Sequence, residues 1–159
     1  MIRPCNDKDI PEIDAIINQA ASVYRGVIPA DCWHEPYMTR VDLLAEIEAG
    51  VEFWGVDAAG ALVGIMGMQR VRDVTLIRHA YVRSAHQGCG IGTALLRQLA
   101  AGVTGPLLVG TWAAAHWAIR FYEQHGFDLV LSTAEKNRLL DMYWKIPVRQ
   151  RETSVVLRR

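Results

Sequence analysis

The sequence predicts an α/β or α+β fold in which helices flank a mixed sheet, within one domain that spans residues 1–159. Segments with helical periodicity alternate with strand-like segments along the chain. Two strand-like segments near the middle are separated by a short turn, and a glycine-rich loop at residues 87–92 separates a strand pattern from a helix pattern. A length of 159 residues, 51% of them hydrophobic, is enough for one domain with a sizeable core.

The first part of the chain is predicted to form a short strand and a helix. Residues 2–4 have a strand pattern, and Pro11 suits the first turn of a helix that extends to about Ala21. Polar residues before Pro11 provide caps for that helix. Its apolar face consists of Ile10, Ile13, Ile17 and Ala20.

A second helix is predicted after an irregular segment. Residues 24–36 contain a glycine and two prolines and show no periodicity. Thr39 and Asp42 then have the spacing of a capping box, and Gly50 suits a helix end. The apolar face of this helix consists of Val41, Leu43, Leu44 and Ile47.

The centre of the chain is predicted to be a hairpin followed by a third strand. Residues 51–56 and 61–71 have strand patterns, and residues 57–60 have the composition of a turn. Residues 75–82 form the next strand, which leads into the glycine-rich loop and a helix.

From residue 107 onward, predicted strands again alternate with predicted helices. Residues 107–111 are nearly all apolar, as is typical of a strand buried on both faces. We expect a helix over 113–125, a strand over 127–131, a helix that begins at the capping residue Ser132, and a final strand over 153–157.

The loop Gln87-Gly88-Cys89-Gly90-Ile91-Gly92 predicts an anion site. Glycine lets the backbone approach a ligand closely and adopt conformations that other residues avoid. The first turn of the helix that follows has unpaired N–H groups and a partial positive charge. The loop therefore favours a phosphate or diphosphate.

Two nucleotide-binding motifs lack residues that they require. A dinucleotide fingerprint needs Gly-x-Gly-x-x-Gly, but position 93 is Thr, and residues 107–111 contain no acidic residue. A P-loop needs a Gly-Lys-Ser/Thr sequence, and no lysine follows the loop.

The loop has the pattern Gln-x-x-Gly-x-Gly and lies between a predicted strand and a predicted helix. In this motif the sequence resembles the GCN5-related N-acetyltransferase (GNAT) superfamily. Gln87, Gly90 and Gly92 match the diphosphate motif of that family. Residues 118–127, Ala-Ile-Arg-Phe-Tyr-Glu-Gln-His-Gly-Phe, match its second signature, Ala-x-x-x-Tyr-Glu-x-x-Gly-Phe. The order of predicted elements also agrees over nearly the whole chain.

The resemblance implies acetyl transfer from acetyl-CoA to an amine by direct transfer in a ternary complex. It implies a mostly antiparallel sheet whose fourth and fifth strands splay apart to admit the pantetheine arm. The residues expected to bind the cosubstrate are Ala80, Tyr81, Val82, Gln87, Gly88, Cys89, Gly90, Ile91, Gly92 and Thr93. A backbone N–H near Val82 is the expected donor to the thioester oxygen.

The resemblance assigns the role of general acid to Tyr122, which would protonate the departing thiolate. Many relatives carry a glutamate base on the fourth strand, but Thr75, Leu76 and Ile77 occupy that region here. His79 is the nearest titratable candidate for the base. Water relayed to Asp73 or Glu52, and His116, are alternatives that the sequence leaves open.

Strand alternation predicts that Arg78 and His79 point to opposite faces of the sheet. One face would carry Thr75, Ile77, His79 and Tyr81, and the other Leu76, Arg78, Ala80 and Val82. One of Arg78 and His79 should therefore face the cleft.

Ala115 stands where relatives often have an asparagine that binds the cosubstrate. Alanine has no side-chain hydrogen-bonding group, so we expect other residues to supply that contact, with Trp112 and Trp117 as apolar candidates.

The acceptor site is expected to be built from residues 24–37, the hairpin and the last strands. Aromatic and acidic residues there would suit an amine: Tyr24, Asp31, Trp33, Glu35 and Trp54. Arg72 and Arg78 would instead suit an acceptor that carries a carboxylate.

The amino-acid composition indicates which classes of partner to expect. Seventeen basic residues balance seventeen acidic ones, and no apolar run approaches the length of a membrane helix, so we expect neither a nucleic-acid nor a membrane partner. Three cysteines without paired spacing favour a cytoplasmic protein without a metal site. The expected partner is a small-molecule or peptide amine, and a homodimer stays open.

The sequence is compatible with three functions. The first is a catalytic acetyltransferase, which the intact Tyr122 and glycine-rich loop favour. The second is an acetyl-CoA-binding or interaction module of the same fold with weak catalysis, which the missing glutamate and asparagine favour. The third, a nicotinamide-dependent redox enzyme, predicts binding of NADH. A catalytic thiol at Cys89 is not favoured, because no histidine has a motif relationship to it.

Overall fold

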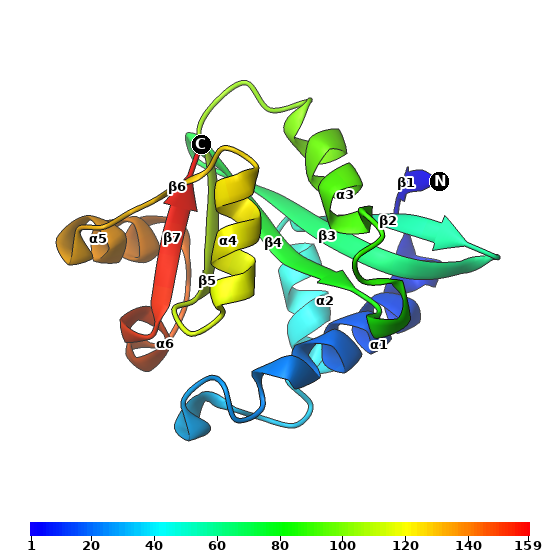
Figure 1. Ribbon diagram of the computed structural model, residues 1–159, viewed down its shortest axis with the longest axis horizontal. Helices are drawn as coiled ribbons and strands as arrows, with labels where there is room; N and C mark the ends of the chain where they lie inside the picture. Colours follow the sequence, from blue (N-terminus) through cyan, green and yellow to red (C-terminus); the bar gives the residue numbers. More distant parts are fainter.

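The computed structural model describes all 159 residues, which form one seven-stranded sheet with helices on both faces (Figure 1). The strands are β1 (Ile2–Pro4), β2 (Glu52–Ala58), β3 (Ala61–Val71), β4 (Val74–Val82), β5 (Leu107–Trp112), β6 (Asp128–Leu129) and β7 (Ser154–Arg158). The α-helices are α1 (Ile10–Ala20), α2 (Arg40–Glu48), α3 (Ile91–Ala100), α4 (His116–Gln124), α5 (Thr133–Tyr143) and α6 (Val148–Glu152). The predicted α/β fold is confirmed.

The strand order in the sheet is β1-β2-β3-β4-β5-β7-β6. Every neighbouring pair is antiparallel except β4 and β5, which are parallel. The sheet is therefore mixed and mostly antiparallel, as predicted. None of the helices is both long enough and apolar enough to cross a membrane.

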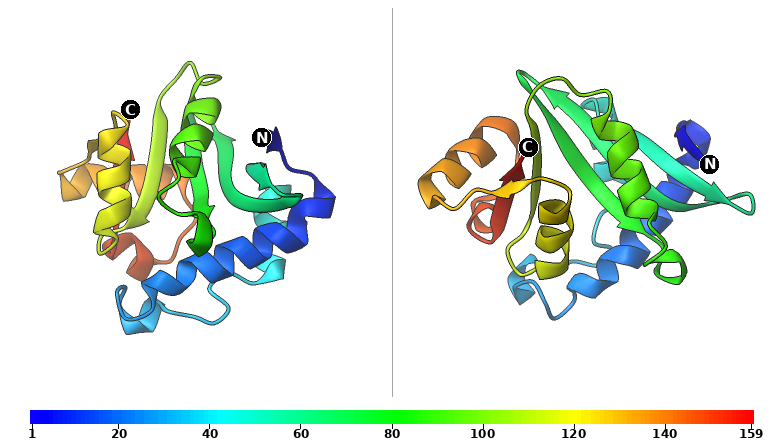
Figure 2. Two further views of the ribbon diagram at one scale, coloured as in Figure 1. Left: turned by 45° about the vertical axis from the view of Figure 1, so that its right-hand side comes forward. Right: turned by 45° about the horizontal axis from the view of Figure 1, so that its top comes forward.

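Apolar side chains on the two faces of the sheet form separate cores. On one face, Ile77 of β4 packs with Leu95 of α3 and Tyr122 of α4. On the other face, the neighbouring residue Leu76 packs with Leu140 of α5, while α1 and α2 cover β2 and β3. Both views in Figure 2 show α3 and α4 on the same side of the sheet. This arrangement fixes the helix that follows the glycine-rich loop beside the end of β4.

The parallel strands β4 and β5 pair only at one end. Their register ends at Ile77 of β4, which lies opposite Val109 of β5. Beyond this point β4 continues to Val82 alongside β3, and β5 continues to Trp112 alongside β7. The two strands diverge in Figure 1, so the expected splaying is confirmed.

A β-bulge interrupts β4 within the diverging part. Tyr81 pairs with Ile65, and Arg78 pairs with Gly67, so His79 and Ala80 together lie opposite Met66. His79 has a φ of 53°, in the left-handed region that non-glycine residues seldom occupy. The bulge changes which face the later residues of the strand occupy.

The predicted alternation along this strand is therefore wrong. Ile77 belongs to the core under α3, whereas Tyr81, which was expected on the same face, packs against the cores on the α1 side. Arg78 and His79 were expected on opposite faces, yet both side chains reach Glu46 of α2. A single extra residue shifts a period-two pattern by one position.

Several element boundaries also differ from prediction. Helix α4 begins at His116 rather than at residue 113, because the Ala113 N–H donates to the carbonyl of Thr153 and holds this segment against β7. Strand β6 contains two residues rather than the predicted 127–131, since it pairs with only one neighbour. Helix α6 was not predicted.

The predicted apolar face of α2 is only partly buried. Leu43 is fully buried, but Val41 is 75% exposed and Leu44 is 46% exposed. The helix contacts the core through a narrow strip, so residues on either side of Leu43 remain in solvent. The Thr39 hydroxyl does accept a hydrogen bond from the Asp42 N–H, which confirms the cap.

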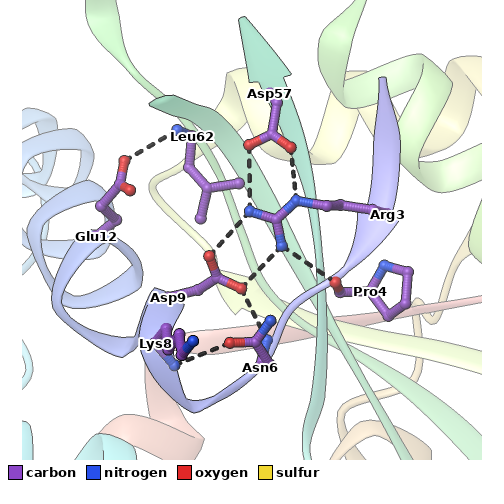
Figure 3. A network of polar contacts seen from close by, with 8 residues as sticks. All are labelled: Arg3, Pro4, Asn6, Lys8, Asp9, Glu12, Asp57 and Leu62. Atoms are coloured by element: carbon purple, nitrogen blue, oxygen red, sulfur yellow. Dashed lines mark hydrogen bonds and ion pairs between the residues drawn. The ribbon is translucent and has the colours of Figure 1, made fainter. Parts of the chain in front are cut away.

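An ion-pair network joins the first strand to the hairpin (Figure 3). The Arg3 guanidinium donates to both carboxylate oxygens of Asp9, at 2.8 and 2.9 Å, and to both oxygens of Asp57. Asp9 also accepts a hydrogen bond from the Asn6 N–H at 2.8 Å. The hydrogen bond with Arg3 lowers the pKa of Asp9 to about 2, because it outweighs burial, which would raise this pKa.

We predict that Asp9→Asn lowers the free energy of unfolding at neutral pH by about 1–2 kcal/mol, because it removes a charge that the Arg3 pair stabilises. The Asp9 pKa is lower in the folded state, so this contribution is present above the unfolded pKa of about 4 and is lost as the pH falls toward 2. Urea denaturation between pH 2 and pH 7 measures both effects.

Asp141→Asn provides a control, because its pair with Arg151 lies on the surface and Asp141 is 60% exposed. That substitution should change stability by less than about 1 kcal/mol. Equal effects of the two substitutions at pH 7 would show that the Arg3 network does not stabilise the fold.

Candidate functional site

A cleft of about 620 Å³ lies between the end of β4, the start of α3 and one side of α4. Its walls include nine of the ten residues that the sequence predicts for cosubstrate binding: Ala80, Tyr81, Val82, Gln87, Gly88, Gly90, Ile91, Gly92 and Thr93. The tenth, Cys89, is exposed and does not line the cleft. The volume is within the range of small-molecule sites.

The backbone of the glycine-rich loop presents a row of free donors to this cleft. The N–H groups of residues 88–93 have no acceptor within the protein, and the first N–H bonded in α3 is that of Ala94, which donates to the Gly90 carbonyl. No acidic residue lies in the first turn of α3. Because these donors and the helix dipole reinforce one another, the loop can bind a multiply charged anion.

Two glycines give this loop its shape. Gly88 and Gly90 have φ values of 77° and 80°, which other residues adopt only with strain. A Cβ added to either one would meet no protein atom within 4 Å, so the space above the loop is open. The loop can therefore bring its N–H groups against a bulky ligand.

Tyr122 lies in the wall of the cleft that α4 forms. Its ring packs edge-on against Phe121 and Phe127, which fixes the side chain, and its hydroxyl makes no hydrogen bond within the protein. Burial, together with nearby Tyr24, raises the pKa of Tyr122, so the hydroxyl keeps its proton at neutral pH. The residue can therefore act as a proton donor in the cleft.

The residues around the start of α4 are apolar. Ala115 is completely buried and offers no side-chain cap to α4. Trp117 is 46% exposed, lines the cleft and stacks on Tyr24 with ring centres 6.0 Å apart. Trp112 is buried instead, and its Nε1–H donates to the Tyr37 hydroxyl at 2.7 Å. Of the two tryptophans, only Trp117 contacts the cleft.

A second cavity, which we call the acceptor chamber, has a volume of about 130 Å³. Its walls come from β4, β5, the start of β7, the segment after α1 and the segment between α5 and α6; they include Tyr24, Tyr37, Ile77, Arg78, His79, Tyr81, Thr111, Trp112, Leu140, Trp144, Ile146 and Ser154. Tyr24 and Tyr81 line both the chamber and the cleft. The two cavities are therefore neighbours on either side of these two tyrosines.

His79 lines the acceptor chamber and not the larger cleft. Its Nε2 hydrogen-bonds with one carboxylate oxygen of Glu46, while the other oxygen accepts from Arg78 Nη2 at 2.6 Å. Burial raises the pKa of Glu46, but the hydrogen bond and charge of His79 and the charge of Arg78 together lower it below its ordinary value. Glu46 is therefore a carboxylate at neutral pH.

The other residues considered as bases lie outside both cavities. Asp73 accepts a hydrogen bond from the Tyr143 hydroxyl at 2.7 Å, and Glu52 and His116 are exposed. Arg72, a candidate for binding a carboxylate, is also exposed and lines neither cavity.

Most residues expected in the acceptor site have other roles. Asp31 pairs with Arg149, Glu35 pairs with Arg25, and Trp54 packs against the core under α3. Trp33 packs beside Tyr37 without lining either cavity. Only Tyr24 of the aromatic and acidic set lines the chamber.

Sequence reasoning did not identify Glu46, and it included Tyr37 only as the end of the segment 24–37. Tyr37 lines the chamber because this segment packs beside Trp112 of β5. Glu46 lies outside the chamber and reaches His79 because α2 lies beside β4. The structure thus brings together the loop, Tyr122, Tyr24, Tyr81 and His79.

The sequence profile of the "Acetyltransferase (GNAT) domain" matches residues 49–129, about half of the chain. A PaiA N-acetyltransferase from Thermoplasma acidophilum, solved in complex with coenzyme A, superposes with a TM-score of 0.73 at 16% identity, over 100% of this chain and 97% of that one.

Two further structures are similar. A ribosomal-protein-alanine N-acetyltransferase from Brucella melitensis gives a TM-score of 0.69 at 20% identity, over 100% of this chain and 98% of that one. An N-acetylglutamate synthase from Neisseria gonorrhoeae, complexed with coenzyme A and N-acetyl-glutamate, gives 0.65 at 21% identity, over 100% of this chain but only 34% of that one. At these identities the likeness concerns the fold.

Proposed function

This chain belongs to the GNAT acetyltransferase family, and on that basis we propose that residues 1–159 act as one domain that transfers an acetyl group from acetyl-CoA to a primary amine. The observation that carries the proposal is the row of unpaired N–H groups at residues 88–93, beside a cleft of about 620 Å³. The proposed transfer is direct, in a ternary complex, and the position of the acceptor chamber beside the cleft, with Tyr24 and Tyr81 lining both, supports it.

The residues of the cleft suit coenzyme A. The N–H groups of residues 88–93 would hold the diphosphate, which carries the charge that a helix N-terminus favours. Residues 80–82 of β4 would lie along the pantetheine arm, since β4 has no partner strand on the side of the gap. A backbone N–H near Val82 would polarise the thioester carbonyl. Trp117 would add an apolar contact where Ala115 offers none.

Tyr122 is the proposed general acid. The amine nitrogen attacks the carbonyl carbon, the C–S bond breaks as the tetrahedral intermediate collapses, and the sulfur takes the Tyr122 proton. The proton that the nitrogen loses as the amide forms then returns to Tyr122 through solvent. The unpartnered hydroxyl and its retained proton support this role.

The acceptor is proposed to be a compact primary amine with an apolar body. The acceptor chamber is small, and aromatic and aliphatic side chains form most of its walls. Arg78 and His79 are its only basic residues, and both are bound to Glu46, so neither is free to hold a carboxylate. His79 is the proposed base that makes the amine neutral.

Thiol release from acetyl-CoA tests the proposal, with a panel of arylalkylamines, diamines, amino acids and a peptide with a free N-terminus. We expect the arylalkylamines to react with the highest kcat/KM. Preference for amino acids would contradict the assignment of the chamber. Firm binding of acetyl-CoA without turnover on any amine would favour the alternative, a weakly catalytic binding module. The buried Ala115, whose side chain cannot hydrogen-bond to the cosubstrate, would fit that alternative.

We predict that Gly90→Val weakens coenzyme A binding at least tenfold, measured by isothermal titration calorimetry. A β-branched residue at a φ of 80° is strained by about 1–2 kcal/mol, and its side chain would cover the N–H groups of the loop. Gly60→Val, in the β2–β3 turn, is the matched control, because its φ is 83° and the space around it is equally open. Unchanged affinity for Gly90→Val would mean that the ligand binds elsewhere.

We predict that Tyr122→Phe lowers kcat at least about 100-fold, as expected for loss of a positioned acid, while the dissociation constant of coenzyme A changes less than about twofold. The ring contacts with Phe121 and Phe127 remain in this variant. Tyr143→Phe is the control, since that hydroxyl contacts Asp73 away from both cavities. A Tyr122→Phe enzyme with the wild-type kcat would remove Tyr122 from the acid role.

A further inference from the structure

Glu46 of α2 stands between two basic side chains of β4. One carboxylate oxygen accepts from Arg78 Nη2 at 2.6 Å, and the other hydrogen-bonds with His79 Nε2. Arg78 is also held by Gln69, to which its Nη1 donates at 3.0 Å. The carboxylate is thus fixed from one side by Arg78 and directed at the imidazole on the other.

The β4 bulge is what allows this contact. His79 has a φ of 53°, and the extra residue opposite Met66 turns the Arg78 and His79 side chains to the same face. The His79 ring also stacks on Phe53 of β2, with centres 6.0 Å apart. Because a left-handed conformation is costly for a residue with a Cβ, its presence beside a cavity is typical of functional positions.

The partner of Nε2 determines the state of the imidazole. An ionised carboxylate can only accept hydrogen bonds, so Nε2 must carry the hydrogen in the Glu46 contact. In the neutral ring the lone pair is then on Nδ1, which makes no hydrogen bond within the protein. His79 lines the acceptor chamber, and its unpaired Nδ1 is not among the enclosed polar atoms of the protein.

We propose that Glu46 is the positioning residue of the acetyl-transfer reaction: it fixes His79 as the Nε2–H tautomer, so that Nδ1 takes the proton of the acceptor ammonium in the chamber. This inference rests on the proposed function. In the step, the N–H bond of the ammonium breaks and leaves its electron pair on the amine nitrogen. The proton adds to Nδ1, the imidazolium pairs with Glu46, and the proton later passes to solvent.

The surroundings of His79 allow this proton transfer. Arg78 and Glu46 are the charged groups beside it, and Tyr24, Tyr37 and Tyr81 are the titratable groups that share the chamber. Burial raises the pKa of all three tyrosines, so they stay neutral near pH 7. The chamber walls from β5, α5 and β7 carry no charged side chain.

The test compares the pH profile of kcat/KM for Glu46→Gln and wild-type enzyme with the best amine of the panel. Glutamine keeps the size of the side chain but not the charge that favours the imidazolium. We expect the plateau of kcat/KM to fall about 10–100-fold, with unchanged coenzyme A affinity. Glu48→Gln, on the exposed side of the same helix, should match the wild type.

A second readout does not depend on turnover. Nitrogen-15 NMR of the wild-type histidine side chains should show neutral His79 as the Nε2–H tautomer, and Glu46→Gln should give a mixture. A wild-type Nδ1–H tautomer would overturn the inference even if Glu46→Gln did not fold. An unchanged plateau of kcat/KM in Glu46→Gln would overturn it as well.

These readouts separate the inference from the proposed function. Absence of thiol release by the wild-type protein with every amine would be a failure of the proposed function. The tautomer of His79 would then decide by itself whether Glu46 fixes the ring.

Discussion

The backbone N–H groups of residues 88–93 have no acceptor in the protein, and all of these residues except Cys89 line the cleft between β4, α3 and α4. Residues 88–90 are exposed and residues 91–93 are half-buried, so a ligand with many acceptor atoms can reach these donors. The fold keeps these donors in place because α3 packs firmly on the sheet through Leu95, Leu96 and Leu99. The direction of α3 therefore decides where the anion binds and where the rest of the ligand must extend.

The sheet provides the space into which that ligand extends. Strands β4 and β5 stop pairing after Ile77 and Val109, and the bulge at His79 then turns β4 away from its earlier register. The gap between the strands begins before the bulge, and the bulge turns the His79 side chain to the same side as Arg78. Tyr24 and Tyr81, which line both cavities, mark the point where the two substrates would meet.

Sequence reasoning succeeded where the relevant residues are close together in the chain. The glycine-rich loop with its helix and the hairpin follow from local patterns, whereas Tyr122 was singled out by the resemblance. The resemblance supplied the splaying of the two parallel strands, which periodicity cannot show.

The rest depends on contacts between distant residues. The bulge at His79 has no signature in the strand pattern, so alternation assigned Arg78 and His79 to opposite faces. Glu46 lies 33 positions from His79 and became visible only when α2 was placed against β4. Asp31 and Glu35 looked like acceptor ligands because their partners, Arg149 and Arg25, could not be deduced from the sequence.

Amide chemical-shift mapping by NMR during a titration with acetyl-CoA tests the central claim most directly. If the loop binds the diphosphate, the amide chemical shifts of residues 88–93 should change most, and they should saturate together with those of residues 80–82. Saturable changes confined to another part of the chain, or no saturable change at all, would contradict this account of the protein.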